Sequence, residues 1–269
     1  MMDDFGMKRN KLTLASRAPA KRQKIWDDLK IMPRGIDRET SEMMHRTHMG
    51  VDNGWQSLLT QALRNALSDG WGGSMIATEV SDILFGTPTP RKTTVNAGVL
   101  KENQVNIVVH GHNPVVSDMV SLASISEDML NKAKEKGADG INLVGVCCTG
   151  NELLMRRGVA MAGNHLMTEL ILSTGAVDLM IVDYQCIMPS LGKIACSYHT
   201  KMVSTSDKAH FPGMEHHEFH PDNAEKKAFN LVEMAIDNFK NRKNVYIPVK
   251  PQEAVGGFSV EAIVGALGG

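Results

Sequence analysis

Cysteine, aromatic residues, net charge and long apolar runs are all scarce in this 269-residue sequence, and each scarcity excludes a class of protein. Four cysteines are too few for a disulfide scaffold, and two of them, Cys147 and Cys148, are neighbours. The 29 basic and 30 acidic residues give a formal net charge of -1, so no overall field attracts nucleic acid or an anionic membrane. No run approaches the roughly 18 apolar residues of a membrane span, and the start resembles no signal peptide. We therefore expect a cytoplasmic protein without a membrane span or a nucleic-acid partner.

The N-terminal third is predicted to be helical. Residues 1–24 are polar and basic and are expected to form a solvated arm. Residues 25–97 form a helical segment, because apolar residues recur at helical spacing over 57–67 and again over 75–85. The glycine-rich DGWGG between these two stretches is expected to break the helix.

Residues 98–269 are predicted to form a Rossmann-like α/β domain that carries part of a metal site. Strands are expected at 105–109, 137–146, 176–184 and 201–205, with helical stretches between them. Strands that alternate with helices predict a mostly parallel sheet with helices on both faces.

Three successive strands of this sheet end in side chains that can bind a metal. The first runs into HGHNP at 110–114, the second into CCTGNE at 147–152, and the third into DYQCIMPS at 183–190. Ligands of parallel sheets gather beyond the carboxyl ends of the strands, so these side chains are expected to converge. Thiolates with imidazole suit zinc, copper, nickel or an iron–sulfur cluster, although the spacing is not that of a zinc finger.

The residues alone leave several interpretations open. A metal site, a cysteine nucleophile and structural packing all fit the strand ends, and chemistry does not separate His110 from His112 as a ligand. Structural roles are expected for Cys196 and His199, and a partly buried pair for His45 and His48. A solvated loop is expected for the histidines at 210, 216, 217 and 220.

The same runs carry a resemblance to a known family. In order along the chain they are PRGIDRET, MHRTHMGVD, LSDGWGGSMIATEVSDILFGTP, VNIVVHGHNP, GINLVGVCCTGNELLMRRG and VDYQCIMPS. They resemble the catalytic subunit of the anaerobic nickel–iron–sulfur carbon monoxide dehydrogenases, and the likeness extends from about Ile25 to the last residue.

The resemblance implies oxidation of carbon monoxide with water to carbon dioxide, two protons and two electrons, with electrons passed to a ferredoxin-like acceptor. It implies a nickel–iron–sulfur cluster of the 4Fe-4S type with a further iron. His112 and Cys148 match the ligands of that iron, and Cys186 matches a ligand of the iron–sulfur part. Asp69 matches a carboxylate that tunes protonation near the site, and Cys147 is a neighbour that supports the ligands. The family is homodimeric.

The departures from the family are also informative. The family's N-terminal cysteine-rich segment and its C-terminal domain have no counterpart in these residues. We therefore expect an incomplete catalytic subunit with an incomplete ligand set, whose missing domains lie on another chain or in a longer product. The alternatives are a non-catalytic metal-binding or interaction module and a hybrid-cluster protein of the hydroxylamine reductase type.

Overall fold

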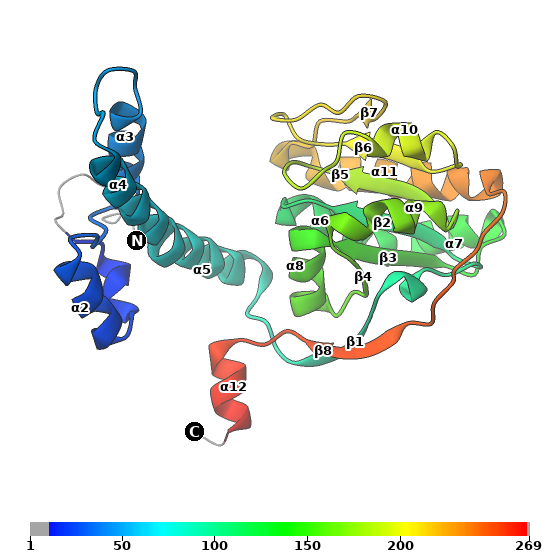
Figure 1. Cartoon of the computed structure of the whole chain (residues 1–269). Coiled ribbons are helices and arrows are strands. Elements are labelled where there is room, and N and C mark those ends of the chain that lie inside the picture. Colours follow the sequence, from blue (N-terminus) through cyan, green and yellow to red (C-terminus); the bar gives the residue numbers. More distant parts are fainter. Residues whose placement is uncertain (1–10, 268–269) are drawn as a thin grey trace. The chain divides into compact units, whose positions relative to one another are not determined.

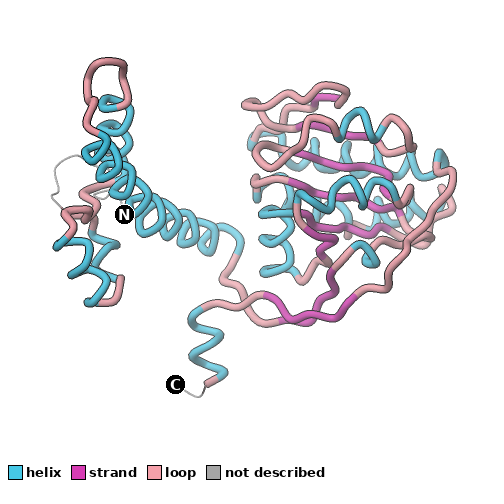
Figure 2. The backbone as a smooth tube through the Cα atoms, in the orientation of Figure 1, coloured by secondary structure: helices cyan, strands magenta, loops and turns pink. Residues whose placement is uncertain are grey.

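The computed structural model describes residues 11–267, which divide into two compact units, one ending at Gly86 and one beginning at Thr87. The strand Arg91–Val95 belongs to the second unit, so the helical unit ends earlier than the predicted residue 97. Figures 1 and 2 show that residues 11–86 of the first unit form only helices and loops, and that the second unit contains a sheet with helices.

The N-terminal unit is built from short helical segments around a small apolar core. Its elements are η1 (Thr13–Arg17), α2 (Ala20–Asp28), α3 (Ile36–Arg46), α4 (Trp55–Ser68), η2 (Asp69–Gly73) and α5 (Ser74–Phe85). The core consists of Leu12, Leu14, Ala15, Ala18, Trp26, Ile31 and Ile76. Over residues 11–24 the expected solvated arm is therefore wrong, because Leu12 and Ala15 are fully buried. Residues 1–10 of that arm lie outside the described part of the chain.

The DGWGG run does not break the helix as predicted. Asp69–Gly73 forms a π-helical turn that joins α4 directly to α5. Gly72 is buried in this turn, and a Cβ at that position would lie 2.9 Å from Cγ1 of Ile36. The glycine is thus used for close packing of the turn against α3.

The C-terminal unit contains a sheet of eight described strands in the order β7-β6-β5-β2-β3-β4-β1-β8. All neighbouring pairs are parallel except β8 with β1. The strands are β1 (Arg91–Val95), β2 (Val105–His110), β3 (Ile141–Val146), β4 (Met161–Gly163), β5 (Val177–Val182), β6 (Lys201–Ser204), β7 (Glu215–His216) and β8 (Gln252–Gly256). The predicted mostly parallel α/β architecture is confirmed.

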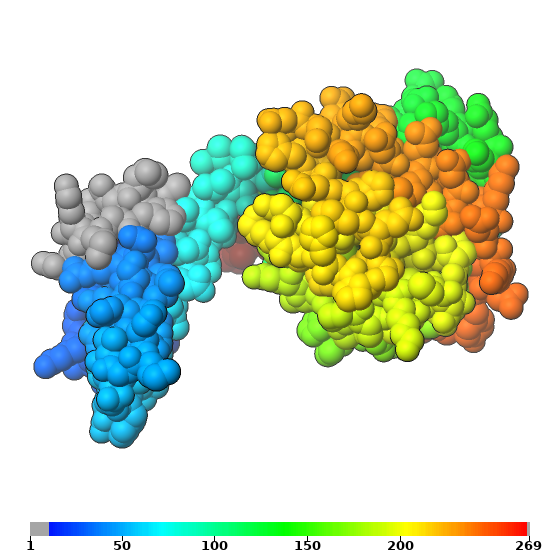
Figure 3. All heavy atoms as spheres, turned by 90° about the horizontal axis from the view of Figure 1, so that it is seen from above, coloured from blue at the N-terminus to red at the C-terminus, as the bar shows by residue number. Residues whose placement is uncertain are grey.

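Helices cover both faces of this sheet. The described helices are α6 (Pro114–Ser124), α7 (Glu127–Glu135), α8 (Cys147–Arg157), α9 (Thr168–Ser173), α10 (Leu191–Ala195), α11 (Ala224–Asn238) and α12 (Val260–Ala266). The short turns are η3 (Ala97–Val99), η4 (His165–Met167), η5 (Pro221–Asn223) and η6 (Phe239–Asn241). One core joins the sheet to α6, α7 and α11, and the other joins it to α9 and α10. Figure 3 shows the segment near residue 200 covering one side of this unit.

Local sequence signals explain where the helices after β2 begin. Asn113 caps α6 by accepting hydrogen bonds from the N–H groups of Val115 and Val116, and Pro114 occupies the first turn. Ser126 caps α7, so the helical stretch between β2 and β3 consists of two helices. Within residues 11–267, no helix is both long and apolar enough to cross a bilayer.

Candidate metal centre

The carboxyl ends of β2, β3 and β5 meet at one edge of the sheet. From β2 the chain builds β3 and β4 on one side, then crosses to build β5, β6 and β7 on the other side. The order reverses between β2 and β5, and at such a point the loops diverge and leave a crevice. His112 follows β2, Cys148 lies in the first turn of α8 directly after β3, and Cys186 follows β5, so these three residues lie around that point.

The loop after β2 is held by a buried carboxylate from the loop after β5. Asp183 is 3 % exposed, and its oxygens accept hydrogen bonds from N–H of His112 at 2.7 Å and N–H of Asn113 at 2.7 Å. It also accepts one from N–H of Tyr184. Burial raises the pKa of Asp183, and the three N–H donors oppose that rise. No role was predicted for Asp183, although its position directly after a buried strand was a signal.

The imidazole of His112 is oriented by the same loop. Nδ1 lies 3.1 Å from the carbonyl oxygen of Tyr184, and the ring stacks against the Tyr184 ring with centroids 6.1 Å apart. With its proton on Nδ1 donated to that carbonyl, the ring presents Nε2 as the free donor atom for a metal. This is the usual arrangement of metal-binding histidines, whose second nitrogen donates to a carbonyl or carboxylate. Of the two histidines in HGHNP, His112 is half-buried and has this geometry, whereas His110 is fully buried.

Cys147 and Cys148 occupy a sharp bend from β3 into α8. Cys147 has φ +60°, a left-handed value that is rare outside glycine, and it begins α8. Gly145 and Gly150 pack backbone to backbone across the bend, so that a Cβ on Gly145 would overlap the Cα of Gly150. The Thr149 N–H donates to the Gly111 carbonyl at 2.8 Å, which joins this bend to the loop after β2. Cys147 is buried and Cys148 is exposed.

Cys186 lies in a second strained turn. Gln185 and Cys186 are consecutive residues with φ +57° and +53°, and the Cys186 side chain is exposed. Burial raises the pKa of the Cys147 thiol to about 11, and the neighbouring Cys186 contributes to the rise. Burial and Cys186 also raise the pKa of Cys148. Strain of this kind is concentrated at functional sites in proteins.

The donor set fits a soft metal cluster. Three thiols that influence one another electrostatically are costly to ionise together, and a bound cation removes that cost. The described residues contain no group of three or more His, Cys, Asp or Glu side chains arranged around a single ion. A cluster needs no such group, because its ligands bind different metal atoms.

His110 lies fully buried at the end of β2. Burial lowers its pKa to about 4, although the main chains of Cys186 and Val146 approach the ring and favour its protonated form. Neither approach is a hydrogen bond, and among the described residues neither ring nitrogen has a hydrogen-bond partner. Such buried unpaired groups are rare in proteins.

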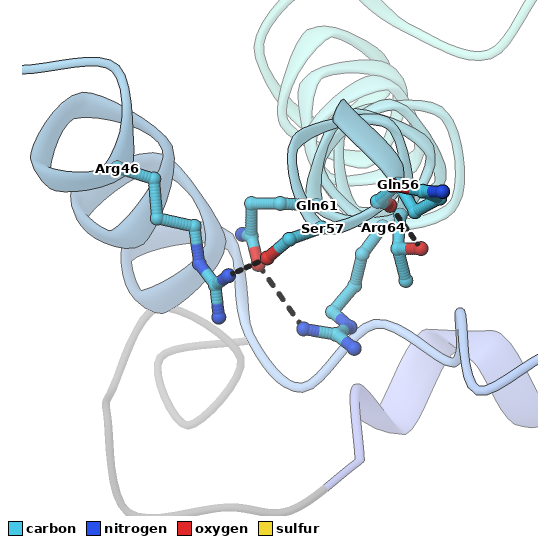
Figure 4. A pocket seen from close by; sticks show the side chains of 6 residues that line it. Arg46, Gln56, Ser57, Gln61 and Arg64 are labelled. Atoms are coloured by element: carbon cyan, nitrogen blue, oxygen red, sulfur yellow. Dashed lines mark hydrogen bonds between the residues drawn. The ribbon is translucent and has the colours of Figure 1, made fainter. Parts of the chain in front are cut away.

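Asp69 belongs to the N-terminal unit, where it lines a hollow of about 360 Å³ with residues of α3 and α4. Its side chain is exposed in the π-helical turn. A second hollow of about 240 Å³ in this unit is lined by Arg46, Ser57, Gln61 and Arg64, among others (Figure 4). Arg46 pairs with Asp52 at 3.1 Å, so the second hollow does not present an unpaired positive charge from that arginine. The role of Asp69 stays a prediction.

The other cysteine and histidine predictions have mixed outcomes. Cys196 is exposed, so its expected packing role is wrong, because the side chain follows the end of α10 at the surface. His199 is structural as predicted, with Nε2 2.9 Å from Asp178. His45 and His48 are both exposed, and α3 ends at Arg46 between them, so they are not a buried pair.

The loop histidines differ in their surroundings. His210 and His220 are exposed, as expected for a solvated loop. His216 is half-buried, stacks on His210 with centroids 3.6 Å apart, and bonds the hydroxyl of Ser204 at 2.8 Å.

The C-terminal unit is a Rossmann-like α/β fold with a candidate metal-cluster site. An oriented imidazole and three thiols lie at the reversal point of its mostly parallel sheet. The chain belongs to the Prismane/CO dehydrogenase family, which it matches over residues 1–266.

Curated relatives are carbon monoxide dehydrogenases. The chain is 54% identical over its whole length to carbon monoxide dehydrogenase 1 of Methanosarcina acetivorans, and 46% identical over 89% of its length to carbon monoxide dehydrogenase 1 of Carboxydothermus hydrogenoformans. It spans 43% of the first of these relatives and 38% of the second.

Solved structures agree with the fold. A nickel-free carbon monoxide dehydrogenase from Thermococcus sp. AM4 matches with a TM-score of 0.93 and 53% identity, over 99% of this chain and 43% of that chain. An acetyl-CoA synthase/carbon monoxide dehydrogenase, described with NiZn[Fe4S4] and NiNi[Fe4S4] clusters in its alpha subunits, matches with a TM-score of 0.89 and 41% identity. That match covers 98% of this chain and 39% of that one.

Proposed function

We propose that this chain supplies part of the catalytic centre of a carbon monoxide dehydrogenase, which converts carbon monoxide and water to carbon dioxide, two protons and two electrons. The observation that carries the proposal is the arrangement of His112, Cys148 and Cys186 just beyond the carboxyl ends of β2, β3 and β5, at the reversal point of the sheet. The family and the named relatives support the same activity.

In this proposal His112 and Cys148 bind an iron and Cys186 binds the iron–sulfur part of a nickel–iron–sulfur cluster. When bound, the cluster supplies electron storage and a Lewis acid for the carbon monoxide and water chemistry. The chain itself positions the ligands. Asp183 fixes the main chain at His112, and the Tyr184 carbonyl fixes the tautomer of the His112 ring. Cys147 lies buried beside the ligands and limits solvent there.

Further partners belong to the same proposal. The relatives are longer than the matched segment, and the remaining cluster thiolates come from segments beyond the match or from another chain. Electrons leave to a ferredoxin-like acceptor, and the assembly is a homodimer. Exposed apolar side chains support contacts with further protein: Ile83 of α5 is 77% exposed and Val260 of α12 is 72% exposed.

The test is a chimaera in which this chain replaces the matching segment of the M. acetivorans carbon monoxide dehydrogenase 1. Prepared without oxygen and loaded with nickel, iron and sulfide, it is expected to reduce methyl viologen with carbon monoxide. Cys148→Ser and Cys186→Ser are each expected to lower the rate at least about 100-fold, beyond the 10- to 100-fold typical of groups that only orient a ligand. Cys196→Ser is the matched control and should keep the rate, because Cys196 is an exposed cysteine at the end of α10 that is not one of the proposed ligands.

The outcomes separate the alternatives. A chimaera that carries nickel and iron but does not oxidise carbon monoxide would favour a non-catalytic metal-binding module. Iron without nickel, together with hydroxylamine reduction, would favour the hybrid-cluster type. The 269-residue chain alone is expected to show no turnover, and turnover would contradict the need for further thiolates.

A further inference from the structure

His110 is a buried polar side chain that the proposed ligand set does not use. It is 0% exposed, and both ring nitrogens are without a hydrogen-bond partner among the described residues. A buried polar group without a partner lowers the stability of the fold that contains it. A histidine in this position therefore destabilises the metal-free fold unless something else bonds it.

The surroundings of the ring indicate where that partner lies. Side chains alternate across a strand, so His110 shares a face of the sheet with Val108, and Val108 belongs to the same core cluster as Cys147. The main chains of Val146 and Cys186 approach the ring, and these two segments carry the thiols after β3 and β5. The ring thus lies beneath the two strained turns that present Cys147, Cys148 and Cys186.

The position of the ring is fixed on several sides. Its own strand is paired along its full length with β3 and from Asn106 onward with β5, with His110 opposite Val146 and Val182. Gly111, the next residue, has φ +136°, and a Cβ on it would overlap the Asp183 carboxylate. The imidazole cannot turn to solvent, so a partner has to come to it.

We propose that His110 is a positioning residue that donates a ring N–H hydrogen bond to a sulfur of the bound cluster, either a sulfide or the Cys186 thiolate. The inference rests on the proposed function, because the sulfur belongs to the cluster held by these loops. Anionic sulfur accepts hydrogen bonds, and such bonds stabilise the reduced, more negative cluster and raise its reduction potential. The destabilisation of the metal-free fold is then offset when the cluster binds.

Two variants test the proposed hydrogen bond: one removes the N–H donor and the other keeps a donor. His110→Leu removes the unpaired nitrogens with little change in size and should raise the melting temperature of the metal-free 269-residue chain by about 2–4 °C. In the loaded chimaera the same substitution should weaken iron retention about 10- to 100-fold and shift the cluster potential to a more negative value. His110→Gln keeps an N–H donor and should restore most of the iron retention.

His199→Leu is the matched control in the same unit. His199 is a buried imidazole that bonds Asp178 near the opposite end of β5, so its loss should lower the melting temperature and leave iron retention and potential unchanged.

The outcomes are distinguishable from failure of the proposed function. A His110→Leu protein that melts lower without metal, or that keeps iron and potential unchanged in a loaded chimaera, would overturn the inference while the ligand assignment stands. A chimaera that holds no cluster with His110 in place would overturn the proposed function and this inference with it.

Discussion

The carboxylate of Asp183 occupies the space that a side chain on Gly111 would need. A Cβ placed on Gly111 would overlap the Asp183 carboxyl group, and the glycine has φ +136°. The two residues come from the loops after β5 and β2, and the same carboxylate bonds N–H of His112. The glycine of the HGHNP run is therefore required by the carboxylate that orders the loop.

Gly111→Ala is expected to lower the free energy of unfolding by about 3 kcal/mol or more, because backbone strain and steric overlap both contribute. Urea unfolding of the 269-residue chain, followed by circular dichroism, measures the loss. Gly137→Ala is the matched control: it also has positive φ, at +92°, but its Cβ would meet nothing within 4 Å. It should cost only about 1–2 kcal/mol. Equal losses for the two variants would contradict the role of Asp183.

Asp178→Asn is expected to destabilise the C-terminal unit by about 3–5 kcal/mol, since it leaves the largely buried guanidinium of Arg242 without its counter-charge. Asp178 is fully buried, pairs with Arg242 at 2.5 Å and also bonds His199 and the Asn106 N–H. Thermal unfolding monitored by circular dichroism checks the value.

Two further variants distinguish the effect on stability of breaking a buried ion pair from the effect of removing an exposed charge. Asp178→Asn combined with Arg242→Met should recover part of the lost stability, because the unpaired charge is gone. Asp207→Asn removes a carboxylate from an exposed pair with Lys208 and should cost no more than about 1 kcal/mol. A single Asp178 variant as mild as the Asp207 variant would refute the argument.

Stability of the N-terminal unit is expected to fall with acid. Burial alone raises the pKa of Glu39, but hydrogen bonds from Arg34 and Gln61 and the charge of Arg34 lower it overall below the ordinary 4.5. Hydrogen bonds from Arg34 likewise lower the pKa of Glu42. A carboxyl with a depressed folded-state pKa contributes stability that is complete above the unfolded pKa and is lost as pH falls through the folded value. The stability contributed by Glu39 and Glu42 therefore begins to fall near pH 4.5 and falls further below it.

Tryptophan fluorescence reports this change without interference from the other unit, because Trp26, Trp55 and Trp71 all precede Gly86. The urea midpoint by fluorescence should drop from pH 6 to pH 4. Glu39→Gln should lower the midpoint at pH 6 and flatten its pH dependence; an unchanged slope would show that other groups facing Arg34 and Arg64 dominate.

The four thiols are expected to react with iodoacetamide at different rates in the metal-free chain. Cys196 and Cys186 are exposed, whereas Cys147 is buried with its pKa raised to about 11, so roughly one Cys147 in a thousand is thiolate at pH 8. Mass spectrometry of peptides should find Cys147 labelled last. Cluster loading in the chimaera should protect Cys148 and Cys186 and leave Cys196 reactive. Protection of Cys196 would argue against the assigned ligands.

Much of the sheet could be predicted, because its central strands carry continuous β-branched runs. The predicted strand 105–109 is observed as Val105–His110, and 176–184 as Val177–Val182. The edge strand β8 was not predicted, since Gln252–Gly256 is short and mostly exposed and owes its conformation to pairing with β1. The sequence pattern of residues 252–256 alone does not predict that they pair with β1.

The N-terminal unit was predicted less well for a related reason. Leu12 and Leu14 are buried, but the lysines and arginines around them make the segment polar on average, so its burial was not predicted. The DGWGG turn stays helical because Gly72 packs against Ile36, a contact between segments far apart in sequence.

At the candidate site, the ends of the strands could be located from the sequence, but the groups that orient the candidate ligands could not. The positions of His112, Cys148 and Cys186 followed from the predicted strand boundaries. The acceptor for the His112 ring is a main-chain carbonyl, which has no side-chain signature. The burial of His110 depends on its two neighbouring strands, β3 and β5.

The pairing of β8 with β1 has a consequence for biosynthesis. β1 makes five residue pairs with β8 and one with β4. During translation β1 emerges long before β8, so it spends that interval as a nearly unpaired strand at the border of a sheet that can otherwise assemble. Unpaired strands of this kind recruit other chains. Ribosome-bound intermediates that end before Gln252 should therefore be the species most in need of chaperones.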